Sequence, residues 1–167
     1  MKSIETERKF IIKKPDVDRL RTCTGYTVSN ITQTYLSSIE GITERVRKRV
    51  YADKTVYTHT KKVRVSRLSS IEDESEVSES EYRKLLLKIK RGTHSVVKER
   101  HTFVLSGVTF EIDIYPEWER SCIMEFELES EDERVEIPEF ISVIREVTGD
   151  VSYSNAAMAK SFPKEEN

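Results

Sequence analysis

Charged side chains recur at every second position in six segments of the sequence, and this alternation restricts the fold more than any other feature. In the segment IETERKF (residues 4–10), Glu5, Glu7 and Lys9 fall on one face of an extended chain. The other five segments repeat the pattern with these charged residues: Arg45, Arg47 and Arg49; Lys62 and Arg64; Lys98 and Arg100; Glu111 and Asp113; Glu125, Glu127 and Glu129. A two-residue period predicts β-strands, each with one charged face.

Turn residues divide the chain into eight candidate strands. These cover roughly residues 2–12, 26–37, 42–51, 54–66, 71–78, 95–104, 108–116 and 121–130, with turns at Glu40-Gly41, Ala52-Asp53-Lys54 and Ser106-Gly107. Helical patterns are fewer and shorter, at residues 14–22, 78–91, 137–150 and 153–162. The sequence therefore predicts a mainly β (α+β) fold, antiparallel, with peripheral helices.

The charged faces allow two interpretations. Antiparallel sheets often expose one polar face to water, and alternation alone favours that interpretation. However, the charges are sorted by strand, with bases on some strands and acids on others, whereas a solvated face usually mixes the two signs. The predicted helices are also too few to cover both sides of eight strands. A closed eight-stranded barrel with charges inside satisfies both observations, provided that the buried ions are paired.

Composition narrows the class of protein. The 167 residues suit one domain, 1–167, in which 161–167 form a polar tail. Charged residues make up 35% of the chain but nearly cancel to a net charge of -2, so binding to nucleic acid is unlikely. Two unrelated cysteines argue against a zinc site or a disulfide framework. No apolar run could span a bilayer, so we expect a cytoplasmic protein without membrane contact.

An inward row of carboxylates and an inward row of bases suggest a ligand that carries both charges. Carboxylates at i and i+2 suit hard divalent cations, which prefer oxygen ligands. Arginine and lysine rows suit phosphate oxygens. The two rows together predict a polyphosphate bound with its metal.

These residues resemble the CYTH superfamily, also called triphosphate tunnel metalloenzymes, and are closest to its small bacterial inorganic-triphosphatase-like members. ETERK matches the ExExK signature of the family, and QTYL resembles its Q-G-Y-L segment with Thr34 in place of glycine. The segments RVR, TKK, ESEV, KER, FEID, MEFELESED and YSNAAMAK follow in the family order. The resemblance covers almost the whole chain and implies an eight-stranded antiparallel tunnel that binds a triphosphate with Mg²⁺ or Mn²⁺.

The resemblance also implies roles for individual residues. The metal ligands would be Glu5, Glu7, Glu125, Glu127 and Asp113, with Glu74, Glu76 and Glu111 as weaker candidates. The phosphate-binding residues would be Lys9, Arg45, Arg47, Lys62, Lys98 and Arg100. The catalytic pair that activates water would be Lys98 with Tyr35, because a cationic neighbourhood can lower the pKa of a lysine. One departure from the family pattern is that Val151 and Ser152 stand at positions that are basic in many small relatives.

The implied function is a metal-dependent phosphohydrolase that cleaves the terminal phosphoanhydride of inorganic triphosphate or an organic triphosphate, which would be its small-molecule partner. The enzymatic alternatives are a class IV adenylate cyclase and a thiamine, nucleoside or RNA triphosphatase. An alternative of another class is a non-catalytic module that binds a phosphorylated ligand. A homodimer is possible, since many barrels of this kind are dimers, although no residue marks an interface.

Overall fold

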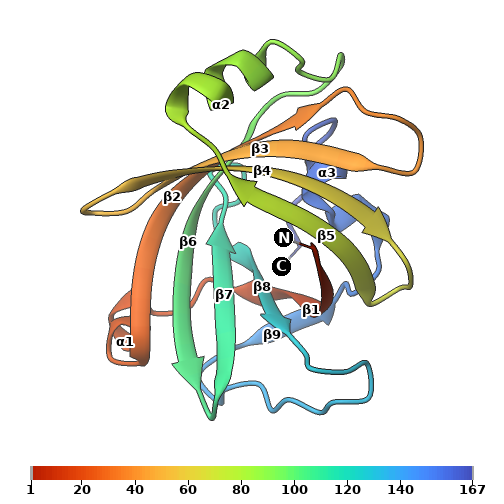
Figure 1. Cartoon of the computed structure of the whole chain (residues 1–167). Helices are drawn as coiled ribbons and strands as arrows, with labels where there is room; N and C mark the ends of the chain where they lie inside the picture. Colours follow the sequence, from red (N-terminus) through yellow and green to blue (C-terminus); the bar gives the residue numbers. More distant parts are fainter. Residues whose placement is uncertain (1, 167) are drawn as a thin grey trace.

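The computed structural model describes residues 2–166, and β-strands dominate it (Figure 1). The strands are β1 (Lys2–Lys13), β2 (Thr24–Leu36), β3 (Thr43–Val50), β4 (Thr55–Arg64), β5 (Ser69–Glu76), β6 (Val96–Leu105), β7 (Val108–Ile114), β8 (Ser121–Glu127) and β9 (Val143–Glu146). The helices are α1 (Val17–Arg21), α2 (Glu79–Leu86), the 3₁₀ turn η1 (Val151–Tyr153) and α3 (Asn155–Met158). The predicted mainly β fold is confirmed.

The strands close into an antiparallel barrel. Their order is β5-β4-β3-β2-β6-β7-β8-β1, and β1 pairs with β5 to complete the ring. β1 has β8 along one edge, and β5 followed by β9 along the other. The turns predicted at Glu40-Gly41 and Ser106-Gly107 join β2 to β3 and β6 to β7. Positive φ values at Gly41 and at both Ser106 and Gly107 explain why small residues stand there.

The prediction of a helix at residues 137–150 is wrong. Residues Val143–Glu146 instead form β9, which pairs with residues 10–12 of β1. The open edge of β1 beyond β5 offers hydrogen-bonding partners, and the β-branched Val143 and Ile144 suit a strand. Tertiary pairing therefore overrides the helical start that Pro138 suggested. The helix predicted for 78–91 forms, with Ser78 as its N-cap, but it ends at Leu86.

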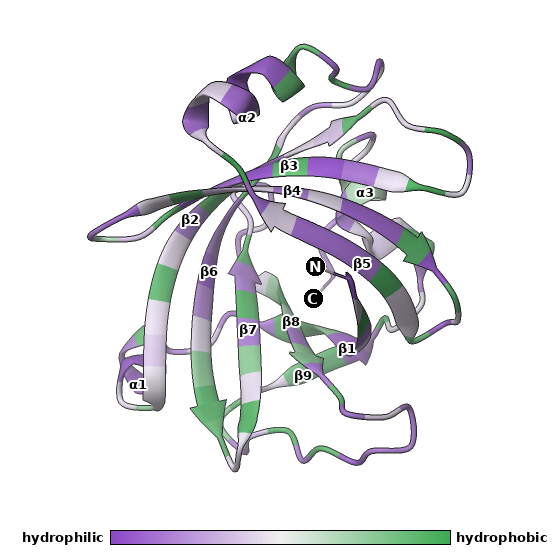
Figure 2. Ribbon diagram, in the orientation of Figure 1, coloured by the Kyte–Doolittle hydropathy of each residue, from purple (hydrophilic) through white to green (hydrophobic). Residues whose placement is uncertain are grey.

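Hydrophilic and hydrophobic residues alternate along most strands (Figure 2). The apolar residues point away from the cavity-lining side chains and are covered by short segments. One cluster, which includes Phe10, Phe103 and Phe126, packs beneath Leu20 of α1 and the chain around Ile141. A smaller cluster of Leu36, Val46 and Tyr82 lies beneath α2. Outward apolar faces leave the opposite faces of these strands to line the interior.

One end of the barrel is closed by apolar packing. At this end the inward-facing positions change from charged to apolar, so that Ile11 follows Lys9 on β1 and Ile123 precedes Glu125 on β8. Ile11 and Ile123 cluster with Trp118, Tyr153 and Met158, which bring η1, α3 and the β7–β8 loop together. We call residues 147–158 the plug. None of the helices formed by residues 2–166 is long and apolar enough to cross a membrane.

Candidate active site inside the barrel

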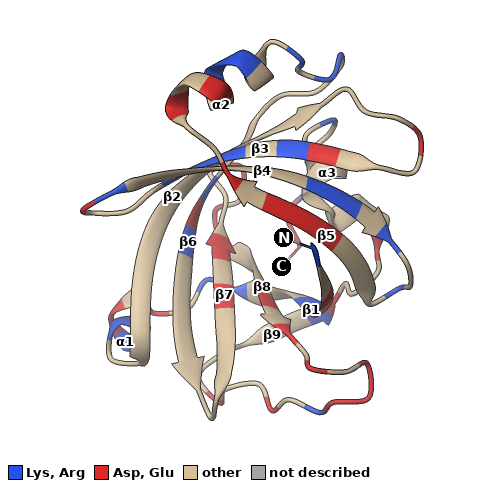
Figure 3. Ribbon diagram, in the orientation of Figure 1, with Lys and Arg blue, Asp and Glu red and all other residues tan. Residues whose placement is uncertain are grey.

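The barrel encloses a cavity of about 510 Å³ whose walls carry opposite charges on different strands (Figure 3). β3 and β4 contribute bases, whereas β5, β7 and β8 contribute acids. The charged lining residues are Glu5, Glu7, Lys9, Arg45, Arg47, Arg49, Lys62, Arg64, Arg67, Glu72, Glu74, Lys98, Arg100, Glu111, Glu125, Glu127 and Asp150. The sorted charges therefore face a shared interior and not bulk water.

The basic wall is held in place by carboxylates of β5. Arg47 Nη2 donates to Glu74 Oε1 at 3.0 Å, and Arg45 Nη2 lies 3.5 Å from Glu72 Oε2. Lys62 Nζ lies 2.5 Å from Glu72 Oε1. The side chain of Glu72 is only 3% exposed. Burial would raise its pKa, but Arg45 and Lys62 keep it below its ordinary value, so this carboxylate stays ionised.

The acidic side of the cavity contains carboxylates that face one another. The register of β1 against β8 sets Glu7 directly opposite Glu127. Burial, followed by repulsion from Glu111, Glu7 and Glu72, raises the pKa of Glu127. Burial and the neighbouring Glu72 raise the pKa of Glu5 to about 7. Lys62, whose Nζ lies 3.7 Å from Glu5 Oε2, only partly offsets the raised pKa of Glu5 and Glu127, and a divalent cation would relieve the remaining repulsion.

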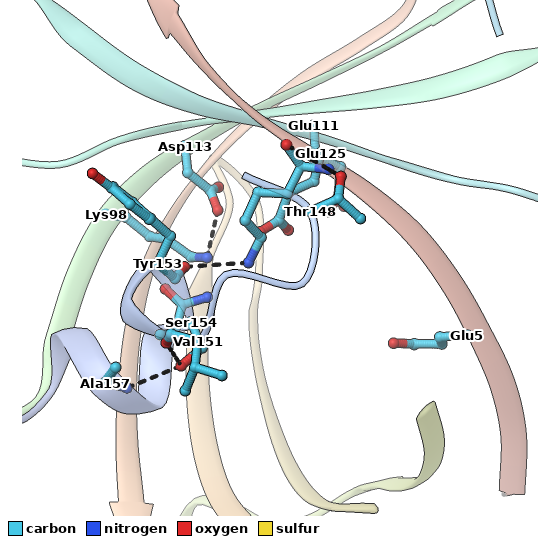
Figure 4. Close-up of polar contacts among 12 residues, drawn as sticks. Glu5, Lys98, Glu111, Asp113, Glu125, Thr148, Val151, Tyr153, Ser154 and Ala157 are labelled. Atoms are coloured by element: carbon cyan, nitrogen blue, oxygen red, sulfur yellow. Dashed lines mark hydrogen bonds and ion pairs between the residues drawn. The ribbon is translucent and has the colours of Figure 1, made fainter. Parts of the chain in front are cut away.

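Three strands bring a compact ionic network to the region next to the plug (Figure 4). Lys98 Nζ donates to Asp113 Oδ2 at 2.5 Å. Arg100 donates from Nε to Asp113 Oδ1 at 2.6 Å and from Nη2 to Asp113 Oδ2 at 2.7 Å, and its Nη1 pairs with Glu111. Arg100 Nη2 also lies 3.5 Å from Glu125 Oε2. Every charge in this network has an opposite neighbour, as buried ions require.

Lys98 has properties that suit proton transfer. Burial and the adjacent Arg100 lower its pKa to about 8, although Asp113 acts in the opposite direction. Its ammonium lies 5.8 Å from the centre of the Tyr115 ring. A lysine with a pKa close to neutrality can exchange a proton under ordinary conditions, unlike an unperturbed lysine.

Tyr35 lies in the cavity wall, but its nearest polar partner is Gln33. Gln33 Nε2 donates to the Tyr35 hydroxyl at 2.6 Å. Burial raises the pKa of Tyr35 even though the Arg45 cation acts to lower it, so the hydroxyl keeps its proton. Tyr35 thus stands beside the basic wall, whereas Lys98 is paired with Asp113; their predicted cooperation stays a prediction.

The plug contributes backbone groups to the cavity. Lys9 Nζ lies 2.7 Å from Glu125 Oε1 and donates to the carbonyl oxygen of Tyr153 at 3.4 Å. Burial would lower the pKa of Lys9, but Glu125 and Glu7 keep it above its ordinary value. Val151 and Ser154 line the cavity beside this lysine. A backbone carbonyl and small side chains therefore stand at the closed end of the cavity, where the sequence departs from the basic family pattern.

The structure brings most of the predicted site residues together. Thirteen of them line the cavity: Glu5, Glu7, Lys9, Tyr35, Arg45, Arg47, Lys62, Glu74, Lys98, Arg100, Glu111, Glu125 and Glu127. Asp113 lies behind the wall, and Glu76 lies outside the residues that line the cavity. Sequence reasoning missed Glu72, although it shares a strand face with Glu74 and the two-residue period could have identified it. It also missed Arg67, which lies in a loop and donates to the Thr148 carbonyl of the plug.

Three carboxylates in the cavity are of the kind that hard divalent cations prefer as ligands. Glu5, Glu7 and Glu127 supply the oxygen ligands that Mg²⁺ and Mn²⁺ prefer. Within residues 2–166, no three His, Cys, Asp or Glu side chains form a group that could hold a metal by themselves. A divalent cation held by these carboxylates would therefore need further ligands, such as phosphate oxygens or water.

Comparison with known proteins gives matches at the level of structure. No protein-family model matches the sequence, and no curated protein matches it significantly. The inorganic triphosphatase NE1496 shares 27% sequence identity, with a TM-score of 0.60 over 96% of this chain and 97% of that chain. The PH1819 protein from Pyrococcus horikoshii OT3 shares 20% sequence identity, with a TM-score of 0.59 over 77% of this chain and 80% of that chain.

A third solved structure has a similar fold. The protein HpAC1 from Hippeastrum, described as a putative adenylyl cyclase with a dominant triphosphatase activity, has a TM-score of 0.53 at 15% identity over 74% of this chain and 80% of that chain. The closed barrel with its sorted charges has the architecture that the resemblance to triphosphate tunnel enzymes implied. The ordered motifs and the match to the inorganic triphosphatase NE1496 along nearly the whole chain support the resemblance of this protein to the CYTH superfamily.

Proposed function

We propose that this protein is a metal-dependent phosphohydrolase that cleaves the terminal phosphoanhydride bond of inorganic triphosphate or an organic triphosphate. The observation that carries the proposal is the arrangement of the cavity, in which a basic wall faces carboxylates that oppose one another across β1 and β8. A polyphosphate complements the basic wall, and a divalent cation complements the carboxylates. The likeness to the inorganic triphosphatase NE1496 over nearly the full length of both chains supports the same activity.

The basic residues would bind the phosphates. Arg45 and Arg47 present planar guanidinium groups, which match phosphate oxygens in a bidentate manner. Lys9, Lys62 and Arg100 would add charge from other strands. Their carboxylate partners keep them fixed before the substrate arrives, so little reorganisation is needed when charge develops on the leaving diphosphate. Phosphoryl transfer depends mostly on such positioning and electrostatics.

Glu5, Glu7 and Glu127 would hold Mg²⁺ or Mn²⁺, with Glu125 and Glu72 close by. When bound, the cation would neutralise charge on the phosphate oxygens. A cation beside Glu5 would also lower the pKa of that carboxyl from about 7, so metal binding would release a proton. Competition between metal and proton is therefore an expected property of this site.

Lys98 would accept the proton of the attacking water. Water would attack the terminal phosphorus in line with the leaving oxygen, its proton would pass to the Lys98 amine, and the bond to diphosphate would break. Orthophosphate and diphosphate are then the products of inorganic triphosphate. Lys98 lies next to the plug, so the terminal phosphate would occupy the closed end of the cavity. Tyr35 would orient the phosphate from the neighbouring wall.

The test is a product analysis with inorganic triphosphate, ATP, GTP and thiamine triphosphate in Mg²⁺ or Mn²⁺. Orthophosphate release from at least one of these compounds supports the phosphohydrolase. The description of HpAC1 as a putative adenylyl cyclase makes cyclase the second candidate, and ATP distinguishes the two: a phosphohydrolase gives ADP and orthophosphate, whereas a cyclase gives cyclic AMP and diphosphate. Calorimetric binding of triphosphate without any product would identify a binding module.

A further inference from the structure

Asp113 is a buried, paired carboxylate that lies next to Lys98, the residue proposed to accept the proton of the attacking water. Its side chain is 1% exposed, and it does not line the cavity, whereas Lys98 and Arg100 do. In Figure 4 its carboxylate points toward the Lys98 ammonium. A carboxylate in this place could either bind the metal, as the family resemblance suggests, or organise the two cations in front of it.

The contacts of Asp113 decide between these two roles. Both of its oxygens already accept charge-assisted hydrogen bonds, Oδ1 from Arg100 Nε and Oδ2 from both Arg100 Nη2 and Lys98 Nζ. Three of the roughly four lone-pair sites of this carboxylate are therefore in use, so a metal ligated by Asp113 would have to approach Oδ1 beside two buried cations or displace one of them. Displacement would leave a buried cation without its partner, at a cost that usually reaches several kcal/mol.

The strand pairing fixes this arrangement. Arg100 stands directly opposite Asp113 in the β6–β7 ladder, and the tight turn at Ser106-Gly107 sets the register of that hairpin. The bidentate contact from Nε and Nη2 orients the guanidinium plane and leaves Nη1 on the side of Glu111. The same carboxylate holds the Lys98 ammonium, so a single group sets the positions of two cavity cations.

We propose that Asp113 is a positioning residue that holds Lys98 and Arg100 toward the bound phosphates and does not ligate the metal. This role rests on the phosphohydrolase function proposed above. It separates Asp113 from Glu7 and Glu127, which line the cavity and face one another. The loss of Asp113 should therefore slow the reaction at every metal concentration, whereas the loss of a metal ligand should be overcome in part by more metal.

The first experiment measures orthophosphate release from inorganic triphosphate while Mn²⁺ is varied, for wild type, Asp113→Asn and Glu7→Gln. We expect Asp113→Asn to lower kcat by about 10- to 100-fold, as misplacement of catalytic groups commonly does, with the half-saturating Mn²⁺ concentration within about twofold of wild type. Glu7→Gln should raise the half-saturating Mn²⁺ concentration about tenfold or more. Recovery of Asp113→Asn activity at high Mn²⁺ would overturn the proposal.

A double-mutant cycle measures the coupling between Asp113 and Lys98 in kcat, which a general loss of stability would not reproduce. Because Asp113 acts partly through Lys98, the loss of rate in Lys98→Met/Asp113→Asn should be at least about tenfold smaller than the product of the two single losses, since residues that act as a unit are not additive. Rate losses that multiply would contradict the proposal. Glu99→Gln serves as the control, because Glu99 lies between Lys98 and Arg100 in the sequence but is exposed on the outer face of the strand, and the substitution also removes one negative charge.

A crystal structure of the wild-type protein with Mn²⁺ and inorganic triphosphate covers the case in which the variants do not fold. Anomalous density for Mn²⁺ should lie at the cavity carboxylates and away from Asp113. Mn²⁺ within coordination distance of Asp113 would overturn the assignment. This result does not depend on turnover, so a wild-type protein that releases no phosphate would refute the proposed function while the metal position still decides the role of Asp113.

Discussion

Glu7 stands directly opposite Glu127 in the pairing of β1 with β8, and both side chains line the barrel cavity. Like charges directly opposite on adjacent strands destabilise a sheet. The strands place this pair inside a closed barrel, near Glu5, whose pKa is already raised. The three carboxylates suit a bound cation, and without one their repulsion lowers the stability of the folded protein.

Metal should therefore stabilise the folded protein. We expect Mn²⁺ at 100 times its dissociation constant to stabilise wild type by about 2.7 kcal/mol, because a ligand that binds only the folded state shifts unfolding by mass action. Glu127→Gln should raise the metal-free melting temperature by about 2 °C through loss of the repulsion, and should reduce the shift that Mn²⁺ produces. Scanning calorimetry with EDTA or Mn²⁺ measures both effects. An equal Mn²⁺ shift in the variant would place the metal elsewhere.

The metal-free protein should lose stability as the pH rises from about 5 to 7. The pKa of Glu5 is raised to about 7 in the folded state by burial and by Glu72, so the folded protein holds a proton that the unfolded chain releases near pH 4.5. The unfolded state binds fewer protons over this range, so the free energy of unfolding falls with pH. Solvent screening of this partly exposed group limits the fall to about 1 kcal/mol.

Glu5→Gln isolates this contribution, because glutamine does not titrate. Urea unfolding at pH 5, 6 and 7 in EDTA should give a steeper fall for wild type than for the variant. Parallel pH dependence in the two proteins would show that Glu5 has an ordinary pKa.

Lys98→Arg tests whether Lys98 transfers a proton or supplies only charge. Arginine keeps the positive charge but cannot act as a base at neutral pH, so we expect a loss in kcat of about 100-fold or more. The wild-type rate should rise with pH through the region of pKa 8. Initial rates of orthophosphate release, measured from pH 6 to 9.5 for wild type and Lys98→Arg, provide both measurements. Near-normal activity of Lys98→Arg would reduce the role of Lys98 to electrostatics.

The C-terminal tail should stabilise the plug. The centroid of the Phe162 ring lies 5.3 Å from that of Trp118 and 5.2 Å from that of Tyr115. Trp118 Nε1 donates a hydrogen bond to the Pro163 carbonyl oxygen. Phe162→Ala removes a half-buried aromatic group, which should cost about 2 kcal/mol and lower the melting temperature by about 4–8 °C. Lys164→Ala, in the same tail but exposed, is the matched control. Equal melting temperatures for wild type and Phe162→Ala would show that the tail adds no stability.

The sequence predicted the barrel because local patterns determine most of it. Alternation along each strand identified the inward face, and turns such as Ser106-Gly107 marked the hairpins. β9 was missed because its formation depends on a free edge of β1 that becomes visible only after the barrel closes, and residues 137–150 have a plausible helical start at Pro138. Long-range pairing of this kind leaves little trace in a short segment.

The candidate site was predictable to the extent that it follows strand alternation. Glu5, Glu7, Arg45 and Arg47 lie in the cavity because their strand face is fixed by the period. The position of Asp113 behind the wall could not be predicted, because alternation gives the side of a strand but not whether a neighbouring cation covers the side chain. The plug contacts depend on how a terminal segment folds back, which no local pattern specifies.

Metal-dependent phosphohydrolase activity is tested most directly by measuring orthophosphate release from inorganic triphosphate by wild type and by the Glu5→Ala/Glu7→Ala variant, with Glu99→Gln as a surface control. Wild type and the control should release orthophosphate, EDTA should abolish this release, and the double variant should lose at least about 100-fold in rate. Wild-type protein that is folded, binds triphosphate and releases no phosphate would contradict the proposed function.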